Sequence, residues 1–200
     1  MSKHISIAAL AIVAWAGTSS AQPEEHGDDG IVGVTSAGQL AVEMDLDEAF
    51  LFEEFFSGSG LNGFIADAPG FTTLETDEPA EDFFVLGADA DIHWRLIATS
   101  GPEMQVYNPF FDIPSMSAGE TFAFGAGNVF DTHPFWFLNT DLPSFDPLQT
   151  EWAVQFQLVD FGATGYSDSE VIEIRFAVPS PASAALLGLA GLTASRRRRN

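Results

Sequence analysis

The most regular stretch of the chain is Trp152-Ala153-Val154-Gln155-Phe156-Gln157-Leu158. Large apolar side chains occupy every second position, and two glutamines lie between them. Successive side chains of a β-strand point to opposite faces of a sheet, so this pattern is typical of a strand with one buried and one solvated face. We therefore expect the chain to build its core from sheets.

The same alternation recurs on both sides of this stretch, at residues 39–46, 91–97 and 171–176. Shorter apolar runs separated by glycine and proline predict further strands at 31–34, 61–65, 83–86, 104–107, 121–124 and 135–138. Segment 162–168 suits a hairpin loop between the last two strands, and segment 47–56 allows either a helix or a strand. Many short strands of this kind predict an all-β fold, an antiparallel β-sandwich or jelly-roll-like domain.

Charge is unevenly distributed along the 200 residues, whose net charge is −22. All 29 carboxylates lie between Glu24 and Glu173. The stretch from Gln22 to Val178 contains all of them but only Arg95 and Arg175 of the seven basic residues, which leaves a net charge of −27 there. Such a surface repels nucleic acid and attracts cations, so we expect no nucleic-acid partner. Diffuse solvation and specific cation binding both remain open.

The N-terminus follows the pattern of a secretory signal peptide. Lys3 precedes an apolar stretch at residues 5–16, and Ser19-Ser20-Ala21 supplies small residues before a cut between Ala21 and Gln22. We expect residues 1–21 to form a signal helix that signal peptidase removes. Residues 22–177 then form an acidic extracytoplasmic β domain.

The C-terminus carries a short hydrophobic tail. Val178-Pro179-Ser180-Pro181 precedes a run of about 14 apolar or small residues, and Arg196, Arg197, Arg198 and Arg199 follow. A stable membrane span needs about 20 residues, and arginines mark a cytoplasmic flank. Segment 178–200 is therefore expected to be a hydrophobic helix that is either trimmed after transient membrane association or retained as an anchor.

This tail resembles the PEP-CTERM sorting signal, which is read by membrane proteases called exosortases. The proline-flanked front, the apolar run with Gly188 and Gly191, and the arginine cluster match, while Ser180 stands where that family usually has glutamate. The resemblance implies export, processing by an exosortase-type protease, and release to the cell surface or an extracellular exopolysaccharide matrix.

Enzyme signatures are absent from the sequence. It contains no Gly-x-Ser-x-Gly elbow, His-Glu-x-x-His motif, phosphate-binding glycine loop or dinucleotide fingerprint. Cysteine is also absent, which excludes thiolate ligands and thiol catalysis. We expect a protein that is not an enzyme and that requires no cofactor for catalysis.

Histidines are few, and two of them lie beside aspartates. His26 lies close to Asp28, and His133 follows Asp131 by two residues. Imidazole combined with carboxylate suits zinc or copper, so His26, Asp28, Asp131 and His133 are a candidate metal site if the two segments converge. Acidic segments 77–82 and 89–91 offer oxygen ligands for calcium, although no EF-hand loop is present.

The middle of the chain also resembles a family of PEP-CTERM proteins linked to zinc-responsive regulation. The shared elements are His26, the Pro69-Gly70-Phe71 element and segment 133–137. That family typically has two histidines one residue apart in the late motif, and Asp131 takes the first place here. Two functions remain: a non-enzymatic structural or interaction protein of the cell surface, and an extracytoplasmic metal-binding protein.

Overall fold

The computed structural model describes residues 29–178 except for 53, 59, 111–114 and 125–127. Within these described residues the chain is all-β, without a helix. The strands are β1 Gly30–Val34, β2 Leu40–Glu43, β3 Phe50–Leu51, β4 Glu54–Gly58, β5 Leu61–Ala66, β6 Phe71–Thr73, β7 Ile92–Thr99, β8 Met104–Tyr107, β9 Thr121–Ala123, β10 Asp131–Thr132, β11 Phe135–Asn139, β12 Glu151–Asp160 and β13 Ile172–Ala177.

These strands form three sheets. Sheet 1 has the order β3-β13-β12-β7-β9, sheet 2 the order β10-β6-β1-β2, and sheet 3 the order β4-β5-β11-β8. Most neighbouring strands run antiparallel, as expected, but β1 pairs with β6 and β13 with β3 in parallel. The prediction of a purely antiparallel arrangement is therefore wrong at these two pairs. In each pair the two strands lie far apart in the sequence, and the long connection between them allows both to run in the same direction.

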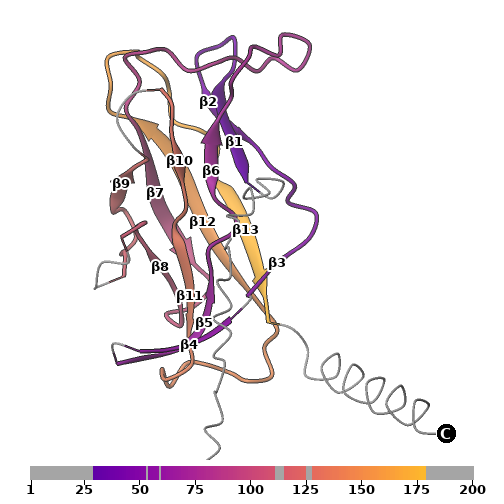
Figure 1. The fold of residues 1–200 in the computed structure, drawn as a ribbon, viewed down its shortest axis with the longest axis vertical. Coiled ribbons are helices and arrows are strands. Elements are labelled where there is room, and N and C mark those ends of the chain that lie inside the picture. Colours follow the sequence, from indigo (N-terminus) through magenta and orange to yellow (C-terminus); the bar gives the residue numbers. More distant parts are fainter. Residues whose placement is uncertain (1–28, 53, 59, 111–114, 125–127, 179–200) are drawn as a thin grey trace, which may run out of the picture.

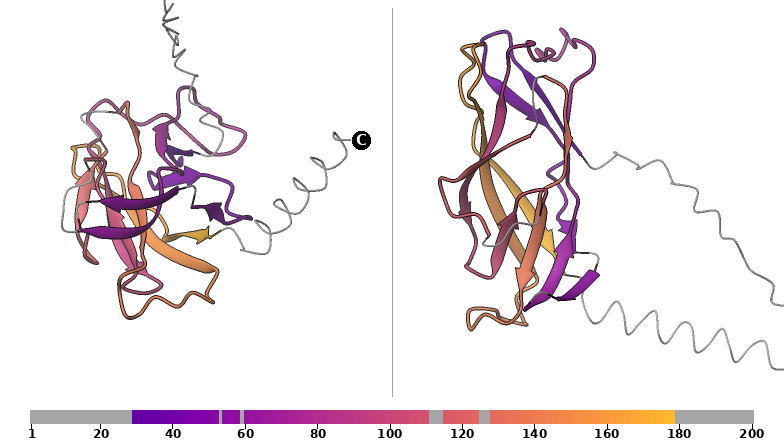
Figure 2. Two further views of the ribbon diagram at one scale, coloured as in Figure 1. Left: turned by 60° about the horizontal axis from the view of Figure 1, so that its bottom comes forward. Right: turned by 60° about the vertical axis from the view of Figure 1, so that its left-hand side comes forward.

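Sheets 2 and 3 pack against the same face of sheet 1. Trp94 of β7 lies 5.9 Å from Trp136 of β11 between ring centroids, and Phe71 of β6 lies 5.3 Å from Phe156 of β12. Figures 1 and 2 show the result, an elongated body with sheet 1 on one side and sheets 2 and 3 one after the other on the opposite side. The aromatic core lies between these two layers.

The alternating stretches form the centre of this core. Trp94, Trp152, Phe156 and Ile174, which the period-two pattern places inward, are all buried. Fully burying an apolar side chain contributes about 1.5–3 kcal/mol, so the inner face of sheet 1 provides the main driving force for folding. Segment 47–56 contains β3 and the start of β4 rather than a helix. Segment 83–86 contributes isolated bridges instead of a strand, one between Phe84 and Val34 and one between Phe83 and Glu78.

The chain crosses between sheets 2 and 3 at two neighbouring places. Residues 67–70 connect β5 to β6, and residues 133–134 connect β10 to β11. The crossings lie side by side because β5 pairs with β11 and β6 pairs with β10. We call this region the seam; it includes a cis peptide bond between Ala68 and Pro69.

The predicted terminal segments fall almost wholly outside the described residues. This applies to the signal peptide, its cleavage site at Ala21 and Gln22, and the sorting tail from Pro179 onward. Val178, the first residue of the sorting motif, follows β13 and donates a backbone hydrogen bond to Thr150. No helix in the described part of the chain is long and apolar enough to cross a membrane.

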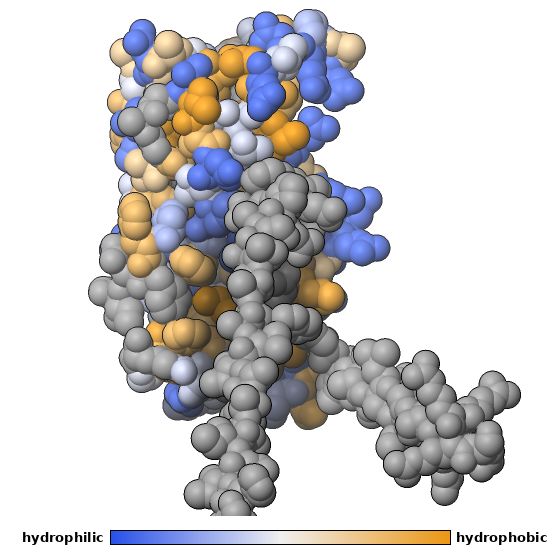
Figure 3. Space-filling view, in the orientation of Figure 1, coloured by the Kyte–Doolittle hydropathy of each residue, from blue (hydrophilic) through white to orange (hydrophobic). Residues whose placement is uncertain are grey.

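Both arginines of the domain are engaged by neighbouring groups. Arg95 donates to Asp168 at 2.6 Å and to Gln157, while Arg175 donates to the backbone oxygens of Leu46 and Asp47. On the face drawn in Figure 3, hydrophobic residues form small groups between hydrophilic ones. The described surface is therefore anionic, with its two guanidinium groups already in use.

Candidate metal centre

The register of sheet 2 brings Asp29 and His133 to the two sides of Gly70. Gly30 pairs with Phe71 in the parallel β1–β6 ladder, and Thr132 pairs with Phe71 in the antiparallel β10–β6 ladder. Extending each ladder by one residue places Asp29, Gly70 and His133 in one row across three adjacent strands. Phe71 points into the core, so this row lies on the opposite, outward face.

Gly70 leaves the space in which the two flanking side chains meet. A Cβ atom at this position would lie 2.5–2.7 Å from Cε1, Nδ1 and Nε2 of the His133 ring. Distances this short are prohibitive, so the imidazole can occupy its position only because residue 70 has no side chain. The same glycine donates its backbone N–H to Oδ1 of Asp29 at 2.8 Å.

The neighbouring residues of the Pro69-Gly70-Phe71 element stabilise the seam from the inside. The buried indole of Trp136 donates its Nε1–H to the carbonyl oxygen of Pro69 at 3.1 Å. Phe71 is fully buried and stacks on Phe124. The Pro69-Gly70-Phe71 element thus connects the hydrophobic core to the row of Asp29 and His133 on the other face of sheet 2.

Asp131 completes a group of three possible ligands. It lies two residues before His133, and the ligand atoms of Asp29, Asp131 and His133 all lie within 4.8 Å of one another. Nε2 of His133 is 3.3 Å from Oδ1 of Asp131 and 3.7 Å from Oδ2 of Asp29. Ligand atoms bound at about 2.0–2.2 Å in tetrahedral geometry are about 3.4 Å apart, so these separations fit a metal ion between them.

The tautomer of His133 follows from its other nitrogen. Nδ1 lies 3.0 Å from the carbonyl oxygen of Asp67, and a carbonyl oxygen can only accept, so Nδ1 carries the proton. In the neutral ring, the lone pair of Nε2 then faces the two carboxylates. A backbone carbonyl bound to the distal nitrogen is the usual arrangement around a metal-ligating histidine, because it orients the ring and raises its basicity.

The Nε2 atom of His133 is shielded from solvent, and within the described part of the chain it has no hydrogen-bond partner. Both carboxylates lie within ion-pair distance of Nε2, but neither forms a hydrogen bond with it. A lone pair facing two anions is unfavourable without a cation. The arrangement is suited to a bound metal ion.

Burial differs among the three groups. The side chain of Asp29 is only 5% exposed, whereas His133 and Asp131 are 33% and 50% exposed. The buried carboxylate is held by the Gly70 backbone. Structural zinc sites have four protein ligands in a tetrahedron, so a group of three calls for a fourth ligand.

Of the four residues predicted as ligands, the structure brings Asp131 and His133 together. His26 and Asp28 lie outside the described residues. Asp29 was missed, because in the sequence it cannot be told apart from Asp28; only the register of β1 against β6 places it opposite Gly70. Gly70 was noted as part of a shared element, but its role depends on contacts across three strands.

A second group of carboxylates, Glu43, Glu78 and Glu81, also lies within 4.8 Å. All three residues are exposed, and none of the group is a histidine. In the acidic segment 77–82 predicted to suit calcium, Asp77 and Asp82 accept backbone hydrogen bonds from Val85 and Ser36. This group is consistent with a solvated acidic surface.

No family model, curated protein or solved structure matches this chain.

Proposed function

We propose that this chain is an exported, non-enzymatic protein that binds a divalent transition metal, with zinc as the best fit, through Asp29, Asp131 and His133. The observation that carries the proposal is the Nε2 lone pair of His133. Nε2 lies 3.3 Å from an oxygen of Asp131 and 3.7 Å from an oxygen of Asp29, while Nδ1–H donates to the Asp67 carbonyl. One imidazole with two carboxylates prefers zinc or copper to calcium, whose sites are built from oxygen alone.

His26 is our candidate for the fourth ligand. It precedes Asp29 by three residues, and three residues span at most about 11 Å, so its imidazole is within reach of the cluster. Asp28, the other predicted ligand in this segment, is the alternative. Either residue would close a tetrahedral site, whereas with neither the fourth position is left to water.

Calorimetric titration with zinc tests the proposal. It should be done on residues 22–178 in about 1 M salt, where the Debye length of about 3 Å suppresses diffuse cation uptake. We expect one site per chain in the native domain, loss of this site in His133→Ala, and no change in the matched control Glu78→Gln. Weaker binding in His26→Ala would identify the fourth ligand. Equal binding in the native domain and in His133→Ala would refute the metal function.

The proposed setting is the cell surface. The signal pattern at residues 1–21 and the PEP-CTERM-like tail at 178–200 support export followed by sorting, with transient or retained membrane attachment through the tail and an exopolysaccharide matrix as a possible environment. The two packed layers support assignment of the domain to the β-sandwich or jelly-roll class. Intact-mass analysis of the surface form should give Gln22 as its first residue, and deletion of Arg196 to Arg199 should misdirect it.

A further inference from the structure

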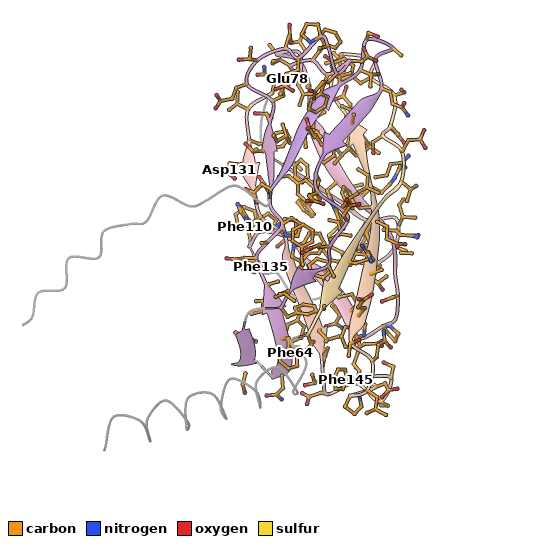
Figure 4. All side chains as sticks on the ribbon, turned by 90° about the vertical axis from the view of Figure 1, so that its right-hand side faces the viewer. Phe64, Glu78, Phe110, Asp131, Phe135 and Phe145 are labelled. Atoms are coloured by element: carbon orange, nitrogen blue, oxygen red, sulfur yellow. The ribbon has the colours of Figure 1, made fainter. Side chains whose placement is uncertain are left out.

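A groove of about 710 Å³ runs beside β6 and β10 and adjoins the proposed metal centre at Asp131. It shares Asp131 with the metal centre and extends past Thr72, Leu74 and Glu75 on one side and Val129 and Phe130 on the other. Thr72 is the direct cross-strand partner of Asp131. Figure 4 places Asp131 on the side of the molecule, between Glu78 at one end and Phe145 at the other. A volume of this size suits a small organic ligand.

The lining of the groove selects against anions. Among the residues that the structure describes, it contains two carboxylates, Glu75 and Asp131, and no lysine, arginine or histidine. Asn128 donates one amide N–H to the Leu86 carbonyl, which leaves its second N–H and its side-chain oxygen for a ligand. The charged groups of this lining are carboxylates, which only accept when ionised, and they suit a ligand that carries N–H donors and a positive charge.

Apolar side chains occupy the space between the acceptors. Leu74 and Phe130 form a floor that is 6–7% exposed, and Val129 stands 76% exposed at the rim. A sugar ligand is usually stacked on an open aromatic face, whereas Phe130, the one aromatic side chain among the described lining residues, is buried. Methylene groups pack well on such aliphatic surface.

From these observations we infer that the groove binds a linear aliphatic polyamine, with an ammonium group at each carboxylate and the methylene chain across Leu74 and Val129. Asp131 is level with Thr72, and Glu75 follows Thr72 by three residues, so the backbone positions of the two acidic residues are at most about 10 Å apart along the strand direction. The terminal nitrogens of spermidine are nine bonds apart, which is about 11 Å in the extended chain, so its two end ammonium groups can reach both carboxylates. Spermidine has the required length and charge.

This inference goes beyond metal binding but connects to it through Asp131. A carboxylate that ligates a metal ion has less charge to offer an ammonium group, and a bound dication repels one. Bound polyamine should therefore weaken zinc binding, and bound zinc should weaken polyamine binding. The two affinities should fall by the same factor, because the coupling free energy between two sites is reciprocal. The groove would then make metal occupancy responsive to extracellular polyamine.

Calorimetry with spermidine tests the inference on residues 22–178 in about 0.15 M salt. Glu75→Gln and Asp131→Asn should each weaken binding about tenfold, as expected for loss of one charge-assisted hydrogen bond at a partly exposed site. Glu173→Gln removes the same charge from the opposite layer and should change the affinity less than about twofold, because a distant surface charge is screened. Fully acetylated spermidine, which keeps the chain but loses the charges, should not bind.

Different outcomes separate the polyamine site from the metal site. Glu75→Gln should leave zinc affinity intact, His133→Ala should abolish zinc binding and leave spermidine binding intact, and Asp131→Asn should weaken both. Glu75-dependent spermidine binding without a zinc site would support the groove and refute only the metal centre. Equal weakening by Glu75→Gln and Glu173→Gln, or Glu75-dependent binding of a neutral oligosaccharide such as maltotriose, would overturn the polyamine proposal.

Discussion

Two carboxylate clusters of this acidic domain have nearly the same spacing and very different surroundings. In the seam cluster, Asp29, Asp131 and His133, one carboxylate is buried and bound by a backbone N–H, and the histidine is oriented through its second nitrogen. In the exposed cluster, Glu43, Glu78 and Glu81, all three side chains face solvent. Proximity of carboxylates therefore means little in a chain with 29 of them; the neighbouring groups that orient the ligands distinguish a site from a charged surface.

Among the substitutions that test the contrast between the clusters, Gly70→Ala should have the largest effect on zinc affinity. The added Cβ would displace the His133 ring while every ligand remains present. Because loss of correct ligand orientation typically costs 10–100-fold, we expect zinc affinity to fall by about that factor. Calorimetric titration in about 1 M salt measures it.

Gly33→Ala is the matched control for that substitution. Its Cβ would lie 2.5 Å from Phe83 and 2.9 Å from the Phe84 carbonyl, so it should destabilise the fold without touching the cluster. Zinc affinity in this variant should stay within about twofold of native once the protein is folded. Equal losses in both variants would mean that Gly70 acts through stability alone.

The exposed cluster should make little difference to specific binding. We expect the triple change Glu43→Gln, Glu78→Gln and Glu81→Gln to leave zinc affinity within about twofold in about 1 M salt, where solvent-exposed charges are screened. At low salt, the same variant should take up fewer weakly bound divalent ions. Equilibrium dialysis at the two salt concentrations separates these effects, and loss of the tight site in the triple variant would contradict the contrast between the clusters.

Asp160 lies outside both clusters, and its carboxylate accepts hydrogen bonds from neighbouring groups of the protein. Burial raises the pKa of Asp160, but hydrogen bonds from the Thr164 hydroxyl and the Asp91 and Gly162 backbones, with the nearby His93, outweigh it and lower the pKa. Its charge therefore stabilises the fold above the range in which an unfolded aspartate titrates, about pH 3.9, and this stabilisation is lost as pH falls through the lower folded pKa.

Asp160→Asn should consequently have the smallest effect on zinc affinity, but it should lower the free energy of unfolding. Denaturant unfolding should find the variant less stable than native at pH 6, with the difference vanishing under strongly acidic conditions. Zinc binding should be unchanged. A stability difference that persists at the lowest pH would show that packing, rather than charge, explains the effect.

Sequence patterns predicted the core better than the site, for a physical reason. β7, β12 and β13 have enough residues for alternation to be visible, and their inward residues are buried as expected. β6 and β10 contain three and two residues, too few for any period, yet their pairing aligns Asp29, Gly70 and His133. His133 and Asp131 were predicted from chemistry alone, while Asp29 and the role of Gly70 required the register between strands distant in sequence.

The most direct test of the metal centre is a crystal of residues 22–178 grown with one equivalent of zinc, with anomalous data collected at the zinc absorption edge. The predicted result is one dominant anomalous peak at about 2.0–2.2 Å from Nε2 of His133 and from one carboxylate oxygen each of Asp29 and Asp131. Peaks located only on exposed carboxylates such as Glu43, Glu78 and Glu81, with His133 paired directly to the aspartates, would contradict it.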